Sequence, residues 1–274
     1  MMKAFEIGTK KTIVFYLHGL RGHGLAQKTS LTHVVRNVGV TLVSLELPGH
    51  GIDSKVQHCM VPKYELIVAD IIATVKAWSE GAEQIILMGY SFGGALMTLA
   101  ANALERDESF TANVAGLVGI STAFDVAHNV PRWQLALVGV IAPLSRLFYQ
   151  HFTAGSRFLT IGEMKVPCIS PDLAVQKSIQ EDDLTYKGRI PLNTSAQVYR
   201  AGVAAKQAID ELACEVLLLH SKDDAIAAPP SPTTFAKKVK LRLFENLRHN
   251  CIDGRMREAV YARREITEFI AAKI

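Results

Sequence analysis

The sequence predicts an α/β fold built on a mostly parallel sheet with helices on both faces, and three observations favour it. Most apolar runs are continuous in Val, Ile and Leu, as in strands that are buried on both faces. These runs alternate with segments whose apolar residues recur every three or four positions, which is typical of helices packed on a sheet. The chain of 274 residues is also long enough to bury a substantial core.

The apolar runs place six strands and three helices in order. The predicted strands are Thr12–Leu17, Thr41–Leu47, Ile85–Gly89, Val114–Ile120, Glu215–His220 and Lys240–Phe244. A helix is expected between the second and third strands, where apolar residues lie three or four apart from Tyr64 to Trp78. Another helix, Gly94–Leu104, is rich in small residues and follows the third strand directly. A last helix is predicted over Arg255–Ala272.

The alternation of strands and helices breaks between about Ala123 and Ala208. This stretch is helical in character and contains five prolines: Pro131, Pro143, Pro167, Pro171 and Pro191. Structureless connections longer than roughly 15 residues are uncommon in compact domains, so the stretch is more than a loop. We interpret residues 123–207 as a helical cap inserted over the carboxyl edge of the sheet, and residues 1–122 and 208–274 as the core.

Within the predicted cap, the segment Trp133–Leu144 is apolar nearly all round. It is shorter than the ~20 residues that span a bilayer. Three interpretations stay open: a buried helix, a wall that binds an acyl chain, and a patch that makes transient contact with a membrane surface. If the segment lines a pocket, Leu137 and Ile141 are the candidate substrate-binding residues.

The pentapeptide Gly89-Tyr-Ser-Phe-Gly93 lies between the third predicted strand and the small-residue helix. A serine on so sharp a strand-to-helix turn is strained, and the flanking glycines relieve the crowding that side chains would create. The turn exposes the hydroxyl beside a helix amino terminus, which favours negative charge on a reacting oxygen. The pattern indicates that Ser91 is a nucleophile; the alternative is a serine that caps the helix.

A second turn, which begins at His18-Gly19, follows the first predicted strand. A His-Gly pair there lets the backbone direct the next amide into the site, so the N–H groups of Leu20 and Phe92 would form an oxyanion hole. The alternative is an ordinary glycine turn.

A serine nucleophile needs a general base and an acid that orients it, in the chain order serine, acid, histidine for this architecture. Two adjacent acids, Asp223 and Asp224, follow the fifth predicted strand. Of the nine histidines only His249 lies beyond the last predicted strand, where it is placed to act as the base for Ser91.

With the strand-turn-helix serine, the His-Gly turn, the acid and the late histidine in order, the chain resembles the α/β-hydrolase superfamily. Further segments are similar to the lysophospholipase and monoacylglycerol lipase family, which is related to the serine aminopeptidase-like hydrolases: Ile169-Ser-Pro-Asp172, Gln180-Glu-Asp-Asp-Leu184, Tyr186-Lys-Gly188, Leu217-Leu-Leu-His220 and Asp224-Ala-Ile226. The resemblance implies an eight-stranded sheet, a helical cap that lines an acyl pocket, and hydrolysis of carboxylic esters. It also implies that Asp224 is the catalytic acid, because the family places that acid two residues before an aliphatic residue, here Ile226.

Three function classes follow from these residues. The first is a serine ester hydrolase that works through an acyl-enzyme on Ser91, His249 and Asp224 and needs no metal or organic cofactor. The second is a peptidase, for which a substrate amine would require acids such as Glu163, Asp172, Glu181, Asp182 or Asp183. The third is a ligand-binding module on the same fold, which would not need three ordered catalytic groups.

The composition of the chain limits the classes of partner and the cellular compartment that are expected. The net charge is only +4 and no basic block occurs, so nucleic acid is not expected as a partner. The four cysteines have no metal-ligand or redox spacing, which fits reduced thiols in the cytoplasm. The amino-terminal residues do not have the order of a signal peptide, so secretion is not expected. A small acyl ester or lipid is the expected substrate, and the oligomeric state stays open.

Overall fold

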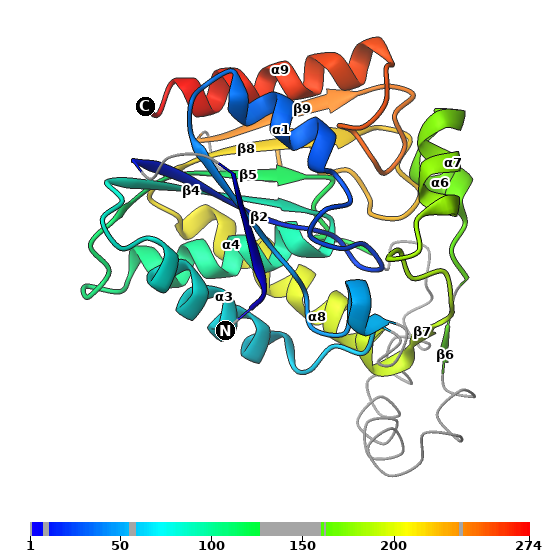
Figure 1. Cartoon of the computed structure of the whole chain (residues 1–274), viewed down its shortest axis with the longest axis horizontal. Coiled ribbons are helices and arrows are strands. Elements are labelled where there is room, and N and C mark those ends of the chain that lie inside the picture. The colour runs from blue at the N-terminus through cyan, green and yellow to red at the C-terminus, as the bar shows by residue number, and fades with distance from the viewer. Residues whose placement is uncertain (1, 8–10, 55–58, 127–159, 162, 236–237) are drawn as a thin grey trace.

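The computed structural model describes residues 2–7, 11–54, 59–126, 160–161, 163–235 and 238–274, and its centre is one seven-stranded sheet (Figure 1). The strands lie in the order β1-β3-β2-β4-β5-β8-β9. β1 pairs antiparallel with β3, and the other neighbouring strands are parallel. Their bounds are β1 Ala4–Ile7, β2 Thr12–Leu17, β3 Thr41–Leu45, β4 Gln84–Tyr90, β5 Asn113–Ile120, β8 Glu215–Ser221 and β9 Val239–Phe244.

The six predicted strands are confirmed, each to within about two residues at its ends. β1 was not predicted, because its four residues are too few to show a pattern. It exists through pairing along β3, where Ala4 lies opposite Leu45. The described residues therefore form seven strands in this sheet, one fewer than the eight that the resemblance implied. No apolar run of the chain had predicted the eighth strand.

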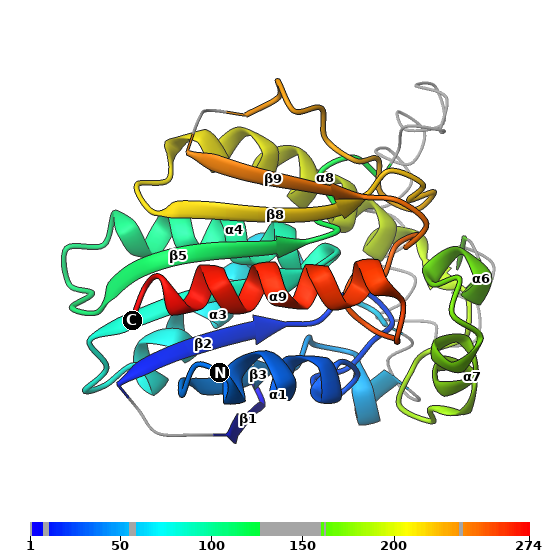
Figure 2. The same ribbon diagram turned by 90° about the horizontal axis from the view of Figure 1, so that it is seen from above.

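Helices cover both faces of the sheet (Figures 1 and 2). α1 (Lys28–Arg36) and α9 (Arg257–Ala271) lie on one face, and α3 (Tyr64–Trp78), α4 (Phe92–Glu105) and α8 (Leu192–Ala208) lie on the other. All three predicted helices are therefore present, as α3, α4 and α9. This arrangement confirms the predicted fold class.

The side chains of β2 alternate between the two cores. Ile13, Phe15 and Leu17 lie in the core that α3, α4 and α8 cover, whereas Val14 and Tyr16 lie in the core under α1 and α9. All five are buried. Burying a large apolar side chain contributes roughly 1.5–3 kcal/mol, so a strand covered on both faces favours apolar residues at every position.

Two short helices, α6 (Val166–Ile169) and α7 (Leu173–Glu181), lie past the carboxyl ends of the strands (Figure 1). They belong to the segment that the sequence assigns to the cap. The remaining short elements are the antiparallel pair β6 Thr160–Ile161 and β7 Ile190–Pro191 and the 3-10 turns η1 Gly51–Asp53 and η3 Ile209–Glu211.

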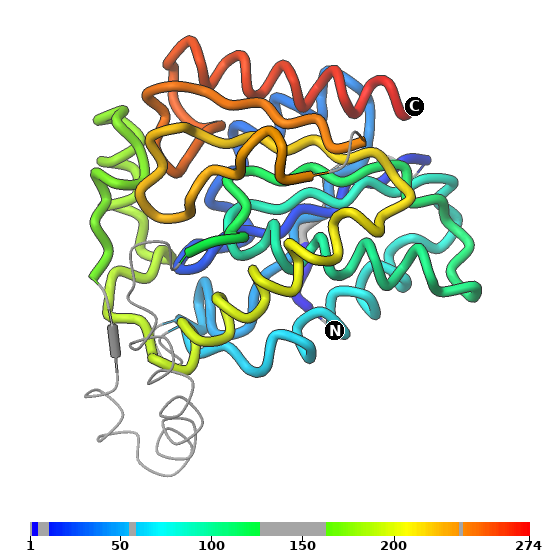
Figure 3. The backbone as a smooth tube through the Cα atoms, turned by 180° about the vertical axis from the view of Figure 1, so that it is seen from behind, coloured from blue at the N-terminus to red at the C-terminus, as the bar shows by residue number. Residues whose placement is uncertain are grey.

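The helix α8 lies beside α4 (Figure 3). Its residues Ala201 and Ala205 are fully buried in the core shared with α3 and α4. The division into a core and a cap over residues 123–207 remains a proposal, in which α8 would complete the core layer as well as end the cap.

Candidate active site

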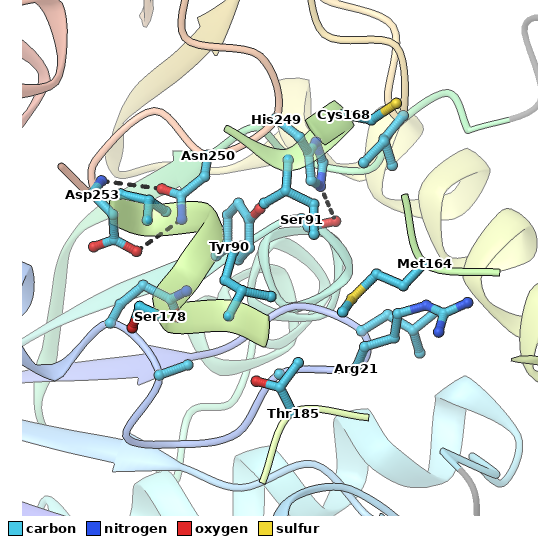
Figure 4. Close-up of a pocket in the computed structure, with 18 of the residues that line it drawn as sticks. Arg21, Tyr90, Ser91, Met164, Cys168, Ser178, Thr185, His249, Asn250 and Asp253 are labelled. Carbon is cyan, nitrogen blue, oxygen red and sulfur yellow. Dashed lines mark hydrogen bonds between the residues drawn. The ribbon is translucent and has the colours of Figure 1, made fainter. Parts of the chain in front are cut away.

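Ser91 lies in the sharp turn between β4 and α4. Its φ of 54° and ψ of −119° are strained for a residue with a Cβ atom. Ser91 occupies the N-cap position of α4, but its hydroxyl makes no capping hydrogen bond. The hydroxyl instead contacts His249 (Figure 4). A serine that merely caps the helix would not have this geometry.

The glycines on either side of Ser91 are required by close approach of the backbone. A Cβ atom on Gly93 would lie 2.3 Å from the carbonyl oxygen of Leu17, and one on Gly89 would lie 2.4 Å from the carbonyl oxygen of Gly93. On the facing loop, a Cβ atom on Gly19 would lie 3.0 Å from the Cβ atom of Ser91. These glycines allow β4, α4 and the loop after β2 to meet around Ser91.

We expect Gly93→Ala to destabilise the protein by at least ~3 kcal/mol, because the new methyl group meets rigid backbone carbonyls. For a chain of this size, this corresponds to a fall in melting temperature of about 6–12 °C. The matched control is Gly81→Ala, where φ is +78° but nothing lies within 4 Å of a Cβ atom. There only the left-handed backbone costs energy, roughly 1–2 kcal/mol. Equal melting temperatures for the two variants would contradict the expectation.

Ser91, His249 and Asp224 form one chain of hydrogen bonds. The Ser91 Oγ lies 2.8 Å from His249 Nε2, and His249 Nδ1 lies 2.7 Å from Asp224 Oδ2. Each residue follows a different parallel strand: Ser91 follows β4, Asp224 follows β8 and His249 follows β9. Because the carboxyl ends of parallel strands meet at one edge of the sheet, residues far apart in sequence come together there.

Asp224 is buried and well supplied with donors. Its Oδ1 accepts hydrogen bonds from the amides of Ile226 at 2.8 Å and Ala227 at 3.1 Å. Burial raises the pKa of the Asp224 carboxyl, but electrostatic attraction to His249 and the hydrogen bonds from His220 and His249 outweigh it and hold the pKa well below its usual range. The carboxylate is therefore ionised at neutral pH and accepts the Nδ1–H of His249, which leaves Nε2 of the imidazole free to accept the Ser91 proton.

The neighbouring acid, Asp223, is exposed, and its hydrogen bonds in the described part of the chain do not include one with His249. Its Oδ1 accepts hydrogen bonds from the hydroxyl of Ser221 and from the amide of Arg248. Another histidine, His220, also contacts the acid: its Nε2 lies 3.0 Å from Asp224 Oδ2 and 3.0 Å from the carbonyl oxygen of Ala227. The contact of His220 with the acid was not predicted, because it depends on how the loop after β8 folds back.

Leu20 and Phe92 both line the cavity beside Ser91. Among the described residues, no acceptor takes a hydrogen bond from either amide. Phe92 is the first residue of α4, so its N–H is one of those that a helix leaves without an intrahelical partner. These two amides are therefore available to a negatively charged oxygen near Ser91.

His18 and Glu46 support the loop that carries Leu20. The buried His18 donates through Nδ1 to the carbonyl oxygen of Gly19 at 2.8 Å, and its Nε2 lies 2.7 Å from Glu46 Oε1. Glu46 also accepts from the amide of Gly24. The sequence analysis had singled out His18 and Gly19 but missed Glu46. The sequence feature that could have indicated Glu46 is its position directly after the buried strand β3.

A cavity of about 1430 Å³ opens in front of Ser91 and His249. Its apolar wall comes largely from the described part of the predicted cap and includes Ile169, Ile179, Ile190 and Val198. Met164, labelled in Figure 4, is part of the same wall. The sequence analysis missed these residues, because their spacing follows no helical period. The wall residues it named, Leu137 and Ile141, lie outside the described residues.

Acidic side chains at the cavity already have partners. Asp182 Oδ2 lies 2.7 Å from His23 Nε2, and Asp172 accepts the amide of Ala174 at the start of α7. Glu163 lies 3.9 Å from Arg189. Two further acids that a peptidase could use for a substrate amine, Glu181 and Asp183, do not line the cavity.

Residues 8–253 match the family model described as serine aminopeptidase, S33. No curated protein sequence matches the chain.

Solved structures of lipases and esterases share the fold. The monoacylglycerol lipase of Paleococcus ferrophilus has 20% sequence identity and a TM-score of 0.78, with 100% of both chains covered. A soluble variant of the Saccharomyces cerevisiae monoglyceride lipase, in complex with a substrate analogue, has 14% identity over 99% of this chain and 92% of that one, with a TM-score of 0.78. A thermostable carboxyl esterase of Bacillus coagulans, in complex with glycerol, has 13% identity over 99% and 94%, with a TM-score of 0.73.

Proposed function

The chain belongs to the serine aminopeptidase (S33) family of α/β-hydrolases, and from this premise we propose that it hydrolyses carboxylic esters of the carboxylesterase, monoacylglycerol lipase or lysophospholipase type. The observation that carries the proposal is the hydrogen-bonded series Ser91–His249–Asp224 at the wall of a largely apolar cavity. The fold shared with lipases and esterases agrees with it.

The reaction proceeds through an acyl-enzyme. His249 Nε2 takes the proton of Ser91 as its oxygen attacks the ester carbonyl, while the ionised Asp224 keeps the imidazole in the required tautomer and stabilises the imidazolium. The amides of Leu20 and Phe92 bind the oxyanion. His249 then returns the proton to the departing alcohol, and water releases the acid by the same steps. These groups complete the reaction without a metal ion or an organic cofactor.

The lining of the cavity favours an ester of an apolar acid over a peptide. The described wall presents Met164, Ile169 and Ile179 to the substrate, and the acids at the cavity already have hydrogen-bond or ionic partners. A substrate amine would have to compete for those acids. An acyl chain needs only the apolar wall.

The cellular setting is part of the proposal. None of the helices in the described ranges has the length and apolar character needed to cross a bilayer. All four cysteines are unpaired, which fits a reducing compartment, and we therefore propose a cytoplasmic location. The substrate is a small ester or lipid, and nucleic acid is not a partner. Transient contact of the cap with a membrane surface stays an open interpretation.

A substrate panel tests the proposal: nitrophenyl esters, a monoacylglycerol, lysophosphatidylcholine and aminoacyl-anilides. We expect at least one ester to be hydrolysed with an efficiency at least ~100-fold above that of the anilides. Faster cleavage of the anilides would favour a peptidase. A folded protein that hydrolyses none of the panel would favour a binding module.

Catalytic efficiency should also rise with the length of the acyl chain. Each methylene that the cavity removes from water contributes about 0.8 kcal/mol at full burial, so a few added carbons raise efficiency at least ~10-fold until the wall is covered. Met164→Asp should abolish this rise and leave short esters nearly unchanged. Leu173→Asp is the control, because Leu173 is 77% exposed and lies off the cavity. A uniform decline over all acyl lengths in Met164→Asp would reject Met164 as part of the acyl wall.

A further inference from the structure

We propose that Arg21 is a positioning residue that fastens the oxyanion loop, residues 18–24, to the cap segment 182–188. The amide of Leu20 would then hold its place in the oxyanion hole only while the cap segment is docked. This inference deepens the proposed function, because it gives a part of the cap a role in the rate of the chemical step.

The backbone of Arg21 gives the first reason. Arg21 directly follows Leu20 and has a φ of 71°, in the left-handed region that favours glycine. A long cationic side chain is uncommon at such a position. We therefore expect the Arg21 side chain to make contacts that glycine could not make.

The side chain of Arg21 reaches the cap. It is 8% exposed, and its guanidinium donates to the carbonyl oxygens of Gly188 and Tyr186. The guanidinium carbon also lies 5.9 Å from the centre of the Tyr186 ring. In the opposite direction, the amide of Tyr186 donates to the carbonyl oxygen of Arg21 at 2.9 Å. Main chain and side chain of one loop residue are thus bound to the same cap segment.

A second tie joins the same two segments. His23 Nε2 lies 2.7 Å from Asp182 Oδ2. Asp182 in turn organises its own segment, because it accepts hydrogen bonds from the amide of Leu184 at 2.9 Å and the hydroxyl of Thr185 at 2.8 Å. The oxyanion loop is therefore bound on one side by the core residue Glu46 and on the other by the cap.

The attachment of the oxyanion loop to the cap segment should affect kcat, because an oxyanion hole depends on the exact position of its donors. Its donors must lie about 2.7–3.1 Å from the oxygen that becomes negative in the transition state, and loss of one donor costs ~10²–10³ in kcat. Arg21 itself lines the cavity, so the test uses a short ester, whose binding depends least on the apolar wall. A released loop should therefore lower kcat and leave the KM of a short ester nearly unchanged.

The decisive variant is Arg21→Gly, because glycine adopts a φ of 71° without strain and removes only the side-chain attachment. With a short nitrophenyl ester, we expect kcat to fall about 10- to 100-fold, KM to change less than ~3-fold, and the affinity of a boronic acid that mimics the tetrahedral intermediate to fall with kcat. Arg21→Lys, which keeps one donor group, should recover part of the loss.

Two further variants separate the attachment from general effects on the cap. Asp182→Asn weakens the second tie and should lower kcat in the same direction by a smaller factor. Glu181→Gln is its matched control: Glu181 is the adjacent residue, is exposed, and pairs only weakly with Lys177 at 3.7 Å. Its kcat should equal that of the parent protein.

Hydrogen exchange of the backbone amides tests the attachment independently of esterase activity. In Arg21→Gly, peptides that cover residues 18–24 and 182–188 should both exchange faster, with the rest of the chain unchanged. Unchanged exchange over 182–188 overturns the attachment. Faster exchange with an unchanged kcat, or a raised KM alone, overturns the positioning role. If the parent protein hydrolyses no ester, the proposed function fails and the positioning role fails with it, while the exchange data still decide whether Arg21 holds the two segments together.

Discussion

Replacement of Ser91 by alanine should reduce ester turnover by a factor on the order of a million while the chain folds normally. Removing the nucleophile of a comparable serine hydrolase has a cost of this size, because no other group can form the acyl-enzyme. The fold should survive, since alanine keeps the Cβ atom of a residue whose hydroxyl caps no helix. The measurements are kcat for the best ester of the panel and the melting temperature of the variant.

Covalent labelling gives the independent check on Ser91. A fluorophosphonate should modify the parent protein at Ser91 and should leave Ser91→Ala unlabelled. Ser178→Ala is the matched control, since Ser178 also lines the cavity (Figure 4) and its loss should not reduce labelling. Labelling of Ser91→Ala at full strength would reject Ser91 as the nucleophile.

The next largest effect should come from Asp224→Asn, with a loss in turnover of roughly 10⁴-fold. The amides of Ile226 and Ala227 hold one oxygen of this side chain, so the asparagine oxygen should stay there. Its NH₂ group then occupies the position of Oδ2 and donates to His249 Nδ1. The imidazole proton is forced to Nε2, where it faces Ser91 and prevents the histidine from acting as a base.

Asp223→Asn is the matched control for Asp224→Asn. The Asp223 carboxylate contacts Ser221 and the amide of Arg248 rather than the imidazole, so we expect turnover to change by only a few-fold. Equal losses in the two variants would mean that the loop acts as a unit. A larger loss in Asp223→Asn would show that the acid has been assigned to the wrong residue.

Much of the fold could be predicted because burial on both faces leaves a strong local signal. The strand β2 is apolar at nearly every position, and its predicted bounds, Thr12–Leu17, agree with the structure. The turn around Ser91 also has a local sequence signal, since a strand, two glycines and a small-residue helix follow one another directly. Order along the chain then indicated that the adjacent acids Asp223 and Asp224 and the histidine His249 follow later strands.

Other features had no local signal. β1 is a strand because Ala4–Ile7 finds the free edge of β3, and four residues alone do not predict this. The contacts of Glu46 with His18 and of Asp182 with His23 join residues that are 28 and 159 positions apart. Such pairs form only when loops from different strands meet, so no pattern within one segment predicts them.

The sequence by itself determined the strand order along the chain, the turn that carries Ser91, and the late histidine His249, because apolar periodicity and glycine-flanked turns are local consequences of burial and backbone sterics. It left Asp223 and Asp224 to be separated by the resemblance to a family. Only the tertiary structure decided which acid faces His249, which residues line the described cavity, and that Arg21 contacts Tyr186 and Gly188. These depend on where the carboxyl ends of parallel strands converge and on how a distant segment docks over them, and distances of a few ångströms across that edge are set by packing of the whole chain.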